Sequence, residues 1–260
     1  MVWAPSSANG YPYNYPITIG SQNIVQINQA SVVTSHNFQL LDTNGDGVVN
    51  NLDDAFSPYY PGDEFVDWIG MSVYHYAGET YPWDYNSVPV VGEFEKIFNL
   101  GNFYSTYAIK RDKPMMISES GAAYHTNTLH DPGNRSAPVP TEVDIKQAFW
   151  RQFLTNATFV QTYSKIKLMC LFEFYKPEDS VRASAGGFPD WRDFRVTVNK
   201  TTRDAFISDF QSVSQFYIPA TKPSLSVDPF DSSSGALDGR WYHPSVGVLF
   251  LIAGLVFDVL

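Results

Sequence analysis

The sequence has very little cysteine and no zinc-binding pattern. Cys170 is the only cysteine among 260 residues, so no disulfide can form within the chain. Its apolar neighbours predict a small, buried hydrophobic side chain. The histidines lack the spacing of zinc ligands; they are His36, His75, His125, His130 and His243. These absences argue against a fold held by disulfides and against a zinc enzyme.

Basic charge is also scarce. The chain carries 17 Lys and Arg against 27 Asp and Glu, a formal net charge of −10. This balance argues against nucleic acid and anionic membrane surfaces as partners, and it fits a neutral polymer or a small molecule. Glycine-rich phosphate loops and the Gly-x-Ser-x-Gly turn of serine hydrolases are absent as well.

Aromatic residues, in contrast, are abundant. The chain has 16 Tyr, 19 Phe and 6 Trp, which together make up 16% of its residues. Sugars stack their C–H faces on flat side chains, so this surplus suits a carbohydrate-binding cleft. The alternative, which we expect for most of these rings, is an aromatic-rich core.

The N-terminus and the glycosylation motifs bear on location. Met1-Val2-Trp3-Ala4-Pro5 is typical of a strand interior and shows no secretory leader, so we expect the chain to begin within a domain. Three N-glycosylation sequons, at Asn134, Asn156 and Asn199, nevertheless favour a secreted or cell-surface protein.

The composition changes at Pro219. Residues 219–244 are rich in Ser, Pro, Asp and Gly and predict a linker, whereas residues 245–260 form an apolar tail. Small residues, a polar spacer and a terminal apolar tail are typical of a glycolipid-anchor (GPI) signal, which is removed from the mature protein. Asp258 weakens this interpretation. A membrane tail anchor and a docked apolar segment are the alternatives.

Strand and helix signals alternate through residues 1–218, which we predict to be one domain. The apolar runs predict four strands, at residues 1–5, 65–74, 113–119 and 166–174. Helical signals follow the last three: residues 94–107 predict a helix or a broken one, and residues 141–157 and 202–216 predict helices. This order implies parallel strands with right-handed crossovers. We therefore expect an α/β fold, a (β/α)8 TIM barrel truncated to about four β/α units.

Two of these strand candidates end in a carboxylate, Glu119 and Glu173. Parallel strands deliver catalytic acids to the mouth of a barrel in this way, although a strand that merely ends in a solvated Glu is the alternative. Retaining glycosidases use two carboxylates about 5–5.5 Å apart. Glu119 suits the nucleophile. Glu173 is either its neighbour or a structural partner of Arg151 or Lys176.

Residues 42–53 have the spacing of a calcium loop, with Gly47 at the sharp turn. The candidate ligands are Asp42, Asn44, Asp46, the Val48 carbonyl and Asp53. The usual Glu at the last position is missing, and an ordinary Asx-turn loop is the alternative. We expect no cofactor for catalysis and at most a structural calcium ion.

Together these motifs resemble the C-terminal half of glycoside hydrolase family 26, most closely its fungal, β-mannanase-like members. Residues 2–5, 59–70, 113–119 and 171–174 are similar to the family's fifth, sixth, seventh and eighth strands. The resemblance covers about residues 1–215. It implies a (β/α)8 barrel, here its last four units, and retaining hydrolysis of a β-linked polysaccharide, mannan or a related glucan.

The resemblance also implies roles for single residues. Glu119 would be the nucleophile, and Tyr74 would orient it through a hydrogen bond. Trp3, or the aromatic loop with Tyr11 and Tyr13, would flank the sugar cleft together with Trp83. Glu173 completes the set of candidate substrate-binding residues.

Three departures from the family pattern bear on activity. The family's acid/base glutamate follows a His at the end of the fourth strand, which would precede Met1, so we expect this chain to lack it. Leu171 stands where many relatives have Trp, and Ser6 where relatives often have Asn. We expect a mannanase-type glycosidase by descent that is weak or inactive alone. A non-catalytic cell-surface polysaccharide-binding protein and an inactive fragment are the alternatives.

Overall fold

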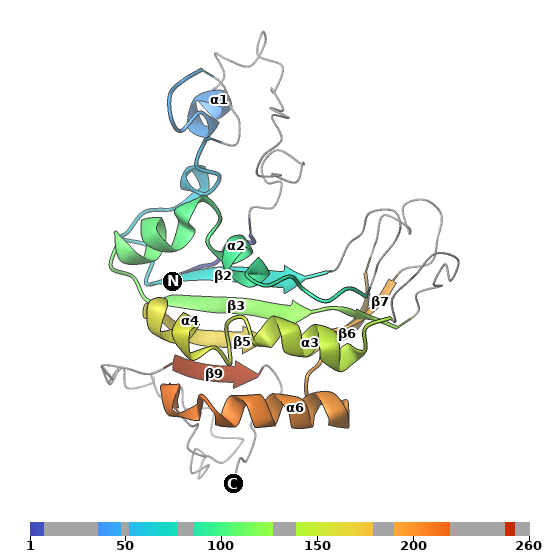
Figure 1. Ribbon diagram of the computed structural model, residues 1–260. Helices are drawn as coiled ribbons and strands as arrows, with labels where there is room; N and C mark the ends of the chain where they lie inside the picture. Colours follow the sequence, from blue (N-terminus) through green and yellow to red (C-terminus); the bar gives the residue numbers. More distant parts are fainter. Residues whose placement is uncertain are drawn as a thin grey trace, which may run out of the picture.

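A parallel β-sheet is the central element of the fold (Figure 1). The computed structural model describes residues 1–7, 36–47, 52–76, 86–126, 139–178, 190–218 and 248–252. The sheet has six strands, in the spatial order β1 (Val2–Trp3), β2 (Trp68–His75), β3 (Met115–Ala122), β5 (Ile166–Leu171), β9 (Val248–Ile252) and β8 (Tyr217–Ile218).

The first four of these strands are the ones that the apolar runs predicted, and neighbours pair in parallel. The α/β class is therefore confirmed. The sheet is open and does not close into a barrel, because β1 and β8 are its two edge strands. Strand β5 ends at Leu171, earlier than predicted, so Glu173 lies in the connection that follows.

Strand β9 comes from the apolar C-terminal segment. It pairs in parallel with β5, from Leu168 opposite Leu249 to Leu171 opposite Ile252, and with β8 on its other side. Part of the segment for which we considered an anchor signal is thus docked in the sheet. The linker and the anchor signal remain predictions. No helix within the described residues has the length and apolar character to span a membrane.

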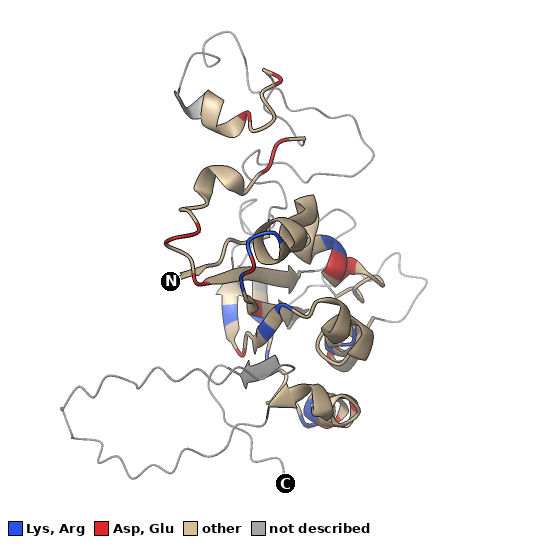
Figure 2. Ribbon diagram, turned by 90° about the vertical axis from the view of Figure 1, so that its left-hand side faces the viewer, with Lys and Arg blue, Asp and Glu red and all other residues tan. Residues whose placement is uncertain are grey.

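Helices cover one face of the sheet, as Figures 1 and 2 show. They are α2 (Glu93–Phe98), α3 (Glu142–Trp150), α4 (Ala157–Thr162) and α6 (Lys200–Gln211). Helix α1 (His36–Leu41) lies apart from the sheet. Short 3-10 turns occupy Ser57–Tyr59, Leu100–Asn102 and Ser214–Phe216, and a π-helix occupies Tyr104–Ile109.

Local signals explain where these helices begin and break. Thr141 and Asp144 form the predicted capping box at the start of α3. This helix ends at Trp150, short of the predicted Ala157, and Asn156 caps the separate helix α4. Of the two forms predicted for residues 94–107, the structure has the broken helix, because Gly101 has a left-handed φ of 64°.

The core lies between the sheet and these helices. The strands contribute Ile69, Met71, Val73, Met115, Ile117, Met169 and Leu171, all almost fully buried. Rings from the helices and their connections fill the space above them; Phe94 of α2 and Phe153, between α3 and α4, for example, stack with centroids 3.8 Å apart. Many of the abundant aromatic residues therefore belong to the core.

A second, smaller sheet lies beyond the carboxyl ends of β3 and β5 (Figure 1). Its three antiparallel strands follow the order β4 (Tyr124–His125), β7 (Asp190–Asp193) and β6 (Tyr175–Glu178). Since β4 follows β3 and β6 follows β5, this sheet forms the rim of the edge where the parallel strands end.

Candidate functional site

Glu119 and Tyr74 meet near the carboxyl ends of β3 and β2. The Tyr74 hydroxyl donates a hydrogen bond of 2.8 Å to Oε2 of Glu119. Glu119 is exposed and Tyr74 is half-buried. The pair has the geometry that the resemblance implies, a carboxylate held from one side by a phenol.

A β-bulge turns Glu119 toward the open face of the sheet. Met115 and Ile117 face the core, so strict alternation would send Glu119 to the core as well. The register instead steps from Ile117, opposite Met71, to Glu119, opposite Ser72, and leaves Ser118 as the extra residue. The Ser118 and Ser72 hydroxyls lie 3.1 Å apart. The bulge therefore re-aims the candidate nucleophile, a known use of bulges at functional sites.

Four further aromatic rings gather around Tyr74. Its ring lies 5.4 Å from Tyr76, 5.5 Å from Phe194 and 5.7 Å from Phe172, between centroids. Phe172 in turn stacks on Phe174 at 5.2 Å. We call these five rings the site cluster. Phe194 is buried, whereas Phe174 is 58% exposed, so the cluster offers a buried floor and an open platform.

Gly121 allows this cluster to close over the end of β3. A Cβ atom at Gly121 would lie 3.1 Å from Cδ1 of Phe194, closer than most real Cβ contacts. The absence of a side chain therefore lets the Phe194 ring rest on the strand directly beyond Glu119.

Glu173 is held by hydrogen bonds from the segment that follows β7. Its carboxylate accepts hydrogen bonds from the Val196 amide at 2.7 Å, the Thr197 amide at 3.2 Å and the Thr197 hydroxyl at 2.6 Å. The partners that we considered lie elsewhere: Arg151 pairs with Asp209, and Lys176 lies over the Phe172 ring. The geometry gives Glu173 a structural role, with partners that differ from those expected.

The structure separates Trp3 from Glu119. Trp3 pairs with Ile69, a core residue, and therefore faces the helices. Its ring packs against Tyr60 at 4.9 Å and Tyr107 at 5.0 Å. It also lines a hollow of about 380 Å³ with Phe56 and other residues of the loop before β2. Tyr11, Tyr13 and Trp83 lie outside the described residues.

Leu171 and Cys170 show how the two faces of β5 differ. Leu171 is 3% exposed and faces the helices, so it is not the residue of β5 that could underlie a sugar. Cys170 faces the side of Glu119. Burial and the negative charge of Glu119 raise the pKa of the Cys170 thiol, which keeps it protonated. The protonated thiol agrees with an inert side chain, but Cys170 is only partly buried, less than the sequence predicted.

The loop that resembles a calcium site is held by its own backbone. The Asp46 amide donates to Oδ1 of Asp42 at 3.1 Å and to Oδ1 of Asn44 at 2.9 Å. Asp53 accepts a hydrogen bond of 2.7 Å from the Thr43 amide. Val48 lies outside the described residues. Within the described part of the chain, no three acidic, His or Cys side chains are grouped so as to hold a metal ion.

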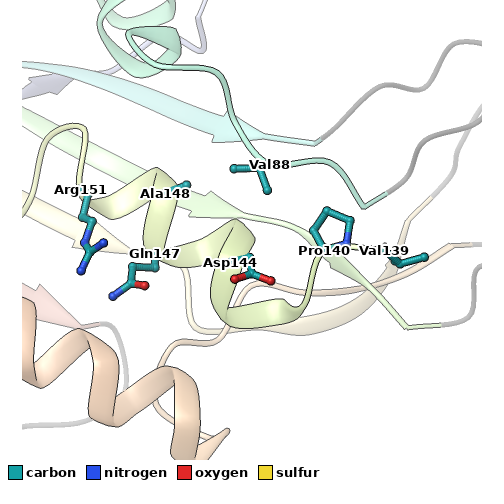
Figure 3. A pocket seen from close by; sticks show the side chains of 7 residues that line it. All are labelled: Val88, Val139, Pro140, Asp144, Gln147, Ala148 and Arg151. Atoms are coloured by element: carbon teal, nitrogen blue, oxygen red, sulfur yellow. The ribbon is translucent and has the colours of Figure 1, made fainter. Parts of the chain in front are cut away.

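A separate hollow of about 440 Å³ lies along α3 (Figure 3), and Glu119 is not among the residues that line it. Its charged lining groups are already engaged. The hydrogen bond from Thr141 lowers the pKa of Asp144, which completes the capping box. Arg151 and Gln147 both bind Asp209. We assign no chemistry to this hollow.

Sequence reasoning missed the members of the site cluster other than Tyr74. The alternation of Phe172 and Phe174 around Glu173 put these two rings on one face, and this signal could have nominated them. Nothing in the local sequence connects Phe194 to Glu119, because the contact joins segments far apart in the chain.

Comparison with known proteins gives a plain result. The chain matches no family model and no curated protein. The resemblance to glycoside hydrolase family 26 therefore rests on the sequence motifs alone.

Proposed function

We propose that this chain is a retaining glycoside hydrolase domain of the β-mannanase type, with Glu119 as nucleophile and a β-linked polysaccharide, mannan or a related glucan, as ligand. The hydrogen bond between Tyr74 and Glu119 carries the proposal. It sits where adjacent parallel strands end, the location of active sites in barrel enzymes, and exposed rings of the site cluster adjoin it.

In this proposal Glu119 attacks the anomeric carbon and forms a glycosyl-enzyme, which water then hydrolyses. Tyr74 holds Oε2 and orients the carboxylate. An unactivated sugar leaving group also needs a proton donor, worth roughly 10²–10⁴-fold in rate. Glu173 is engaged by Val196 and Thr197, so we assign it no acid/base role. We therefore expect little turnover of β-mannan by this chain alone.

An activated substrate tests the nucleophile without the acid. A 2-deoxy-2-fluoro-β-mannosyl fluoride loses fluoride, which needs no proton donor, and its glycosyl-enzyme is long-lived. We expect intact-protein mass spectrometry to show one added glycosyl group and peptide mapping to place it on Glu119. Glu119→Gln should abolish labelling. Tyr74→Phe should slow it about 10- to 100-fold, because one hydrogen bond to the carboxylate is lost.

Glu64→Gln, which changes an exposed carboxylate before β2, is the matched control and should label normally. Absence of label on the wild-type chain, or label on another carboxylate, would refute the role of Glu119.

A non-catalytic polysaccharide-binding protein is the second candidate. The engaged state of Glu173 and the open ring pair of Phe172 and Phe174 favour it. Calorimetry with manno-oligosaccharides tests it. Phe174→Ala should weaken binding about 5- to 10-fold through lost stacking. Phe65→Ala removes a ring of nearly equal exposure, 57% against 58%, before the start of β2 and should have no effect. Equal losses in both variants would contradict a specific sugar platform.

A further inference from the structure

Two serine hydroxyls lie beside Glu119 on the open face of the sheet. Ser72 of β2 stands opposite Glu119 of β3 in the register, so both side chains project from the same face. Ser118 is the extra residue of the bulge, and its hydroxyl oxygen lies 3.1 Å from that of Ser72. This short distance puts Ser118 on the same face as Ser72. We call Ser72 and Ser118 the serine pair.

The serine pair keeps hydrogen-bonding capacity for a ligand. Two hydroxyls have two O–H donors, and the contact between them uses one. The other O–H has no acceptor among the residues that the structure describes. Both serines are half-buried, so a ligand can reach them. Ser120 differs, because it is fully buried and its hydroxyl donates to the Cys170 carbonyl oxygen at 2.8 Å.

The position of the pair fits one group of a bound sugar. In the proposed function, Glu119 attacks the anomeric carbon, C1, and Tyr74 already holds its Oε2. The 2-hydroxyl is carried by the carbon next to C1, so it stays close to the attacking carboxylate. Neighbouring strands lie about 4.8 Å apart, and Ser72 stands directly across from Glu119. The serine pair is therefore within reach of the 2-hydroxyl when C1 is at Glu119.

The other groups beside Glu119 are less suited to bind this hydroxyl. The Tyr74 hydroxyl donates its hydrogen to Glu119 itself. On the other side of Glu119, β5 contributes Cys170, whose pKa is raised by burial and by the charge of Glu119. Its protonated thiol is only a weak donor and acceptor. The serine pair is thus the stronger hydrogen-bonding group next to the candidate nucleophile.

We propose that the serine pair binds the 2-hydroxyl of the sugar unit that Glu119 attacks. This inference rests on the proposed function and restricts its ligand to units whose 2-hydroxyl is free. In glycoside hydrolysis, hydrogen bonds to this hydroxyl strengthen as the oxocarbenium-like transition state forms. Binding by the serine pair therefore accelerates the attack in addition to holding the sugar.

Two substrates that differ only at carbon 2 test the inference with the full chain. One is β-mannosyl fluoride, which has the 2-hydroxyl. The other is 2-deoxy-2-fluoro-β-mannosyl fluoride, whose fluorine cannot donate a hydrogen bond. In both, an oxygen of Glu119 bonds to C1 while the C1–F bond breaks, and fluoride leaves with the electron pair. A fluoride-selective electrode therefore follows the same step, attack by Glu119, for the two substrates.

Variants of the serine pair locate the effect. Ser72→Ala and Ser118→Ala should each slow the first fluoride release from β-mannosyl fluoride about 5- to 50-fold, the range of one hydrogen bond that strengthens in the transition state. Release from the 2-fluoro substrate should change by less than about twofold, because the coupled group is absent. Ser208→Ala, which changes an exposed serine of α6 on the helix side of the sheet, should leave both rates unchanged.

The outcomes separate this inference from the proposed function. Equal slowing of both substrates would show that the serine pair only holds the bulge in place, and it would overturn the inference. Unchanged rates in both serine variants would overturn it as well. In either case, labelling of the wild-type chain at Glu119 leaves the proposed function standing. A wild-type chain that releases fluoride from neither substrate above the spontaneous rate overturns both.

Discussion

The assignment of Glu173 to structure makes a sharp prediction. Its carboxylate ties the connection after β5 to Val196 and Thr197 through three hydrogen bonds, and both partners are buried. Glu173→Ala would leave two buried backbone amides and a hydroxyl without their acceptor. Glu173→Gln would keep one acceptor oxygen. It would replace the other oxygen by an NH2 group, which cannot accept a hydrogen bond from the amides and hydroxyl of Val196 and Thr197.

The magnitude follows from these contacts. Loss of a hydrogen bond to a charged group, or an unsatisfied buried donor, costs about 1–3 kcal/mol. Because Glu173 is partly exposed and water can replace part of the loss, we expect Glu173→Ala to reduce the free energy of unfolding by about 2–4 kcal/mol. At roughly 2–4 °C per kcal/mol for a domain of this size, the melting temperature falls by about 4–16 °C.

Two measurements on the same samples separate structure from catalysis. Thermal or urea unfolding measures stability, and the rate of labelling by the activated fluoro-mannoside, taken where each variant is folded, measures the chemistry at Glu119. We expect both Glu173 variants to be less stable and to label at close to the wild-type rate. A Glu173→Gln protein of unchanged stability that labels a hundredfold more slowly would refute the structural assignment.

Three further predictions address packing, pH and metal. Gly121→Ala should cost about 1–3 kcal/mol of stability, because the new Cβ meets Phe194; an unchanged urea midpoint would contradict the close packing. Burial raises the pKa of Asp209, but its hydrogen bonds lower it by more, and the largest of these effects is that of Arg151. The net pKa of Asp209 therefore lies below the usual value. The ionised carboxylate therefore stabilises the fold above about pH 4, and this contribution is lost as the pH falls through the lowered pKa; Asp209→Asn should flatten that acid limb, and parallel profiles would contradict it. If the loop around Asp42 binds calcium, the hypothesis opposed to an ordinary Asx-turn loop, Ca²⁺ at roughly 100 times Kd should raise the free energy of unfolding by about 2.7 kcal/mol and so raise the melting temperature relative to EDTA. Asp42→Asn should abolish the shift, and identical melting in Ca²⁺ and EDTA would refute the site.

Four of the six parallel strands, β1, β2, β3 and β5, were predictable because each lies in an apolar run, whereas β8 and β9 were not predicted as strands. Such runs specify a strand without reference to distant residues. The start of α3 was predictable for a similar reason, since its capping box lies within four consecutive residues, Thr141 to Asp144. The orientation of Glu119 was not. Its direction depends on the bulge at Ser118, which exists only through the pairing of β3 with β2.

The surroundings of Glu119 escaped sequence reasoning for the same physical reason. Phe194 follows β7 and reaches Tyr74 across a large separation in sequence. Trp3 failed to join the site because its pairing with Ile69 turns it to the helices. A local pattern gives the type of element, whereas the facing of a side chain depends on its neighbours in space.

The position of β9 gives the C-terminal apolar segment two mutually exclusive fates. As a strand, it supplies the hydrogen-bonding partners of Leu168–Leu171 in β5 and holds β8 in the sheet. As an anchor signal, it would be cut away during maturation. In a lipid-anchored form, β5 would then lose its β9 partner and expose unpaired backbone N–H and C=O groups along that edge. Such an edge is a template to which a strand of another chain can add. Anchoring and self-association would be coupled, and the two forms of the protein would differ in oligomeric state as well as in location.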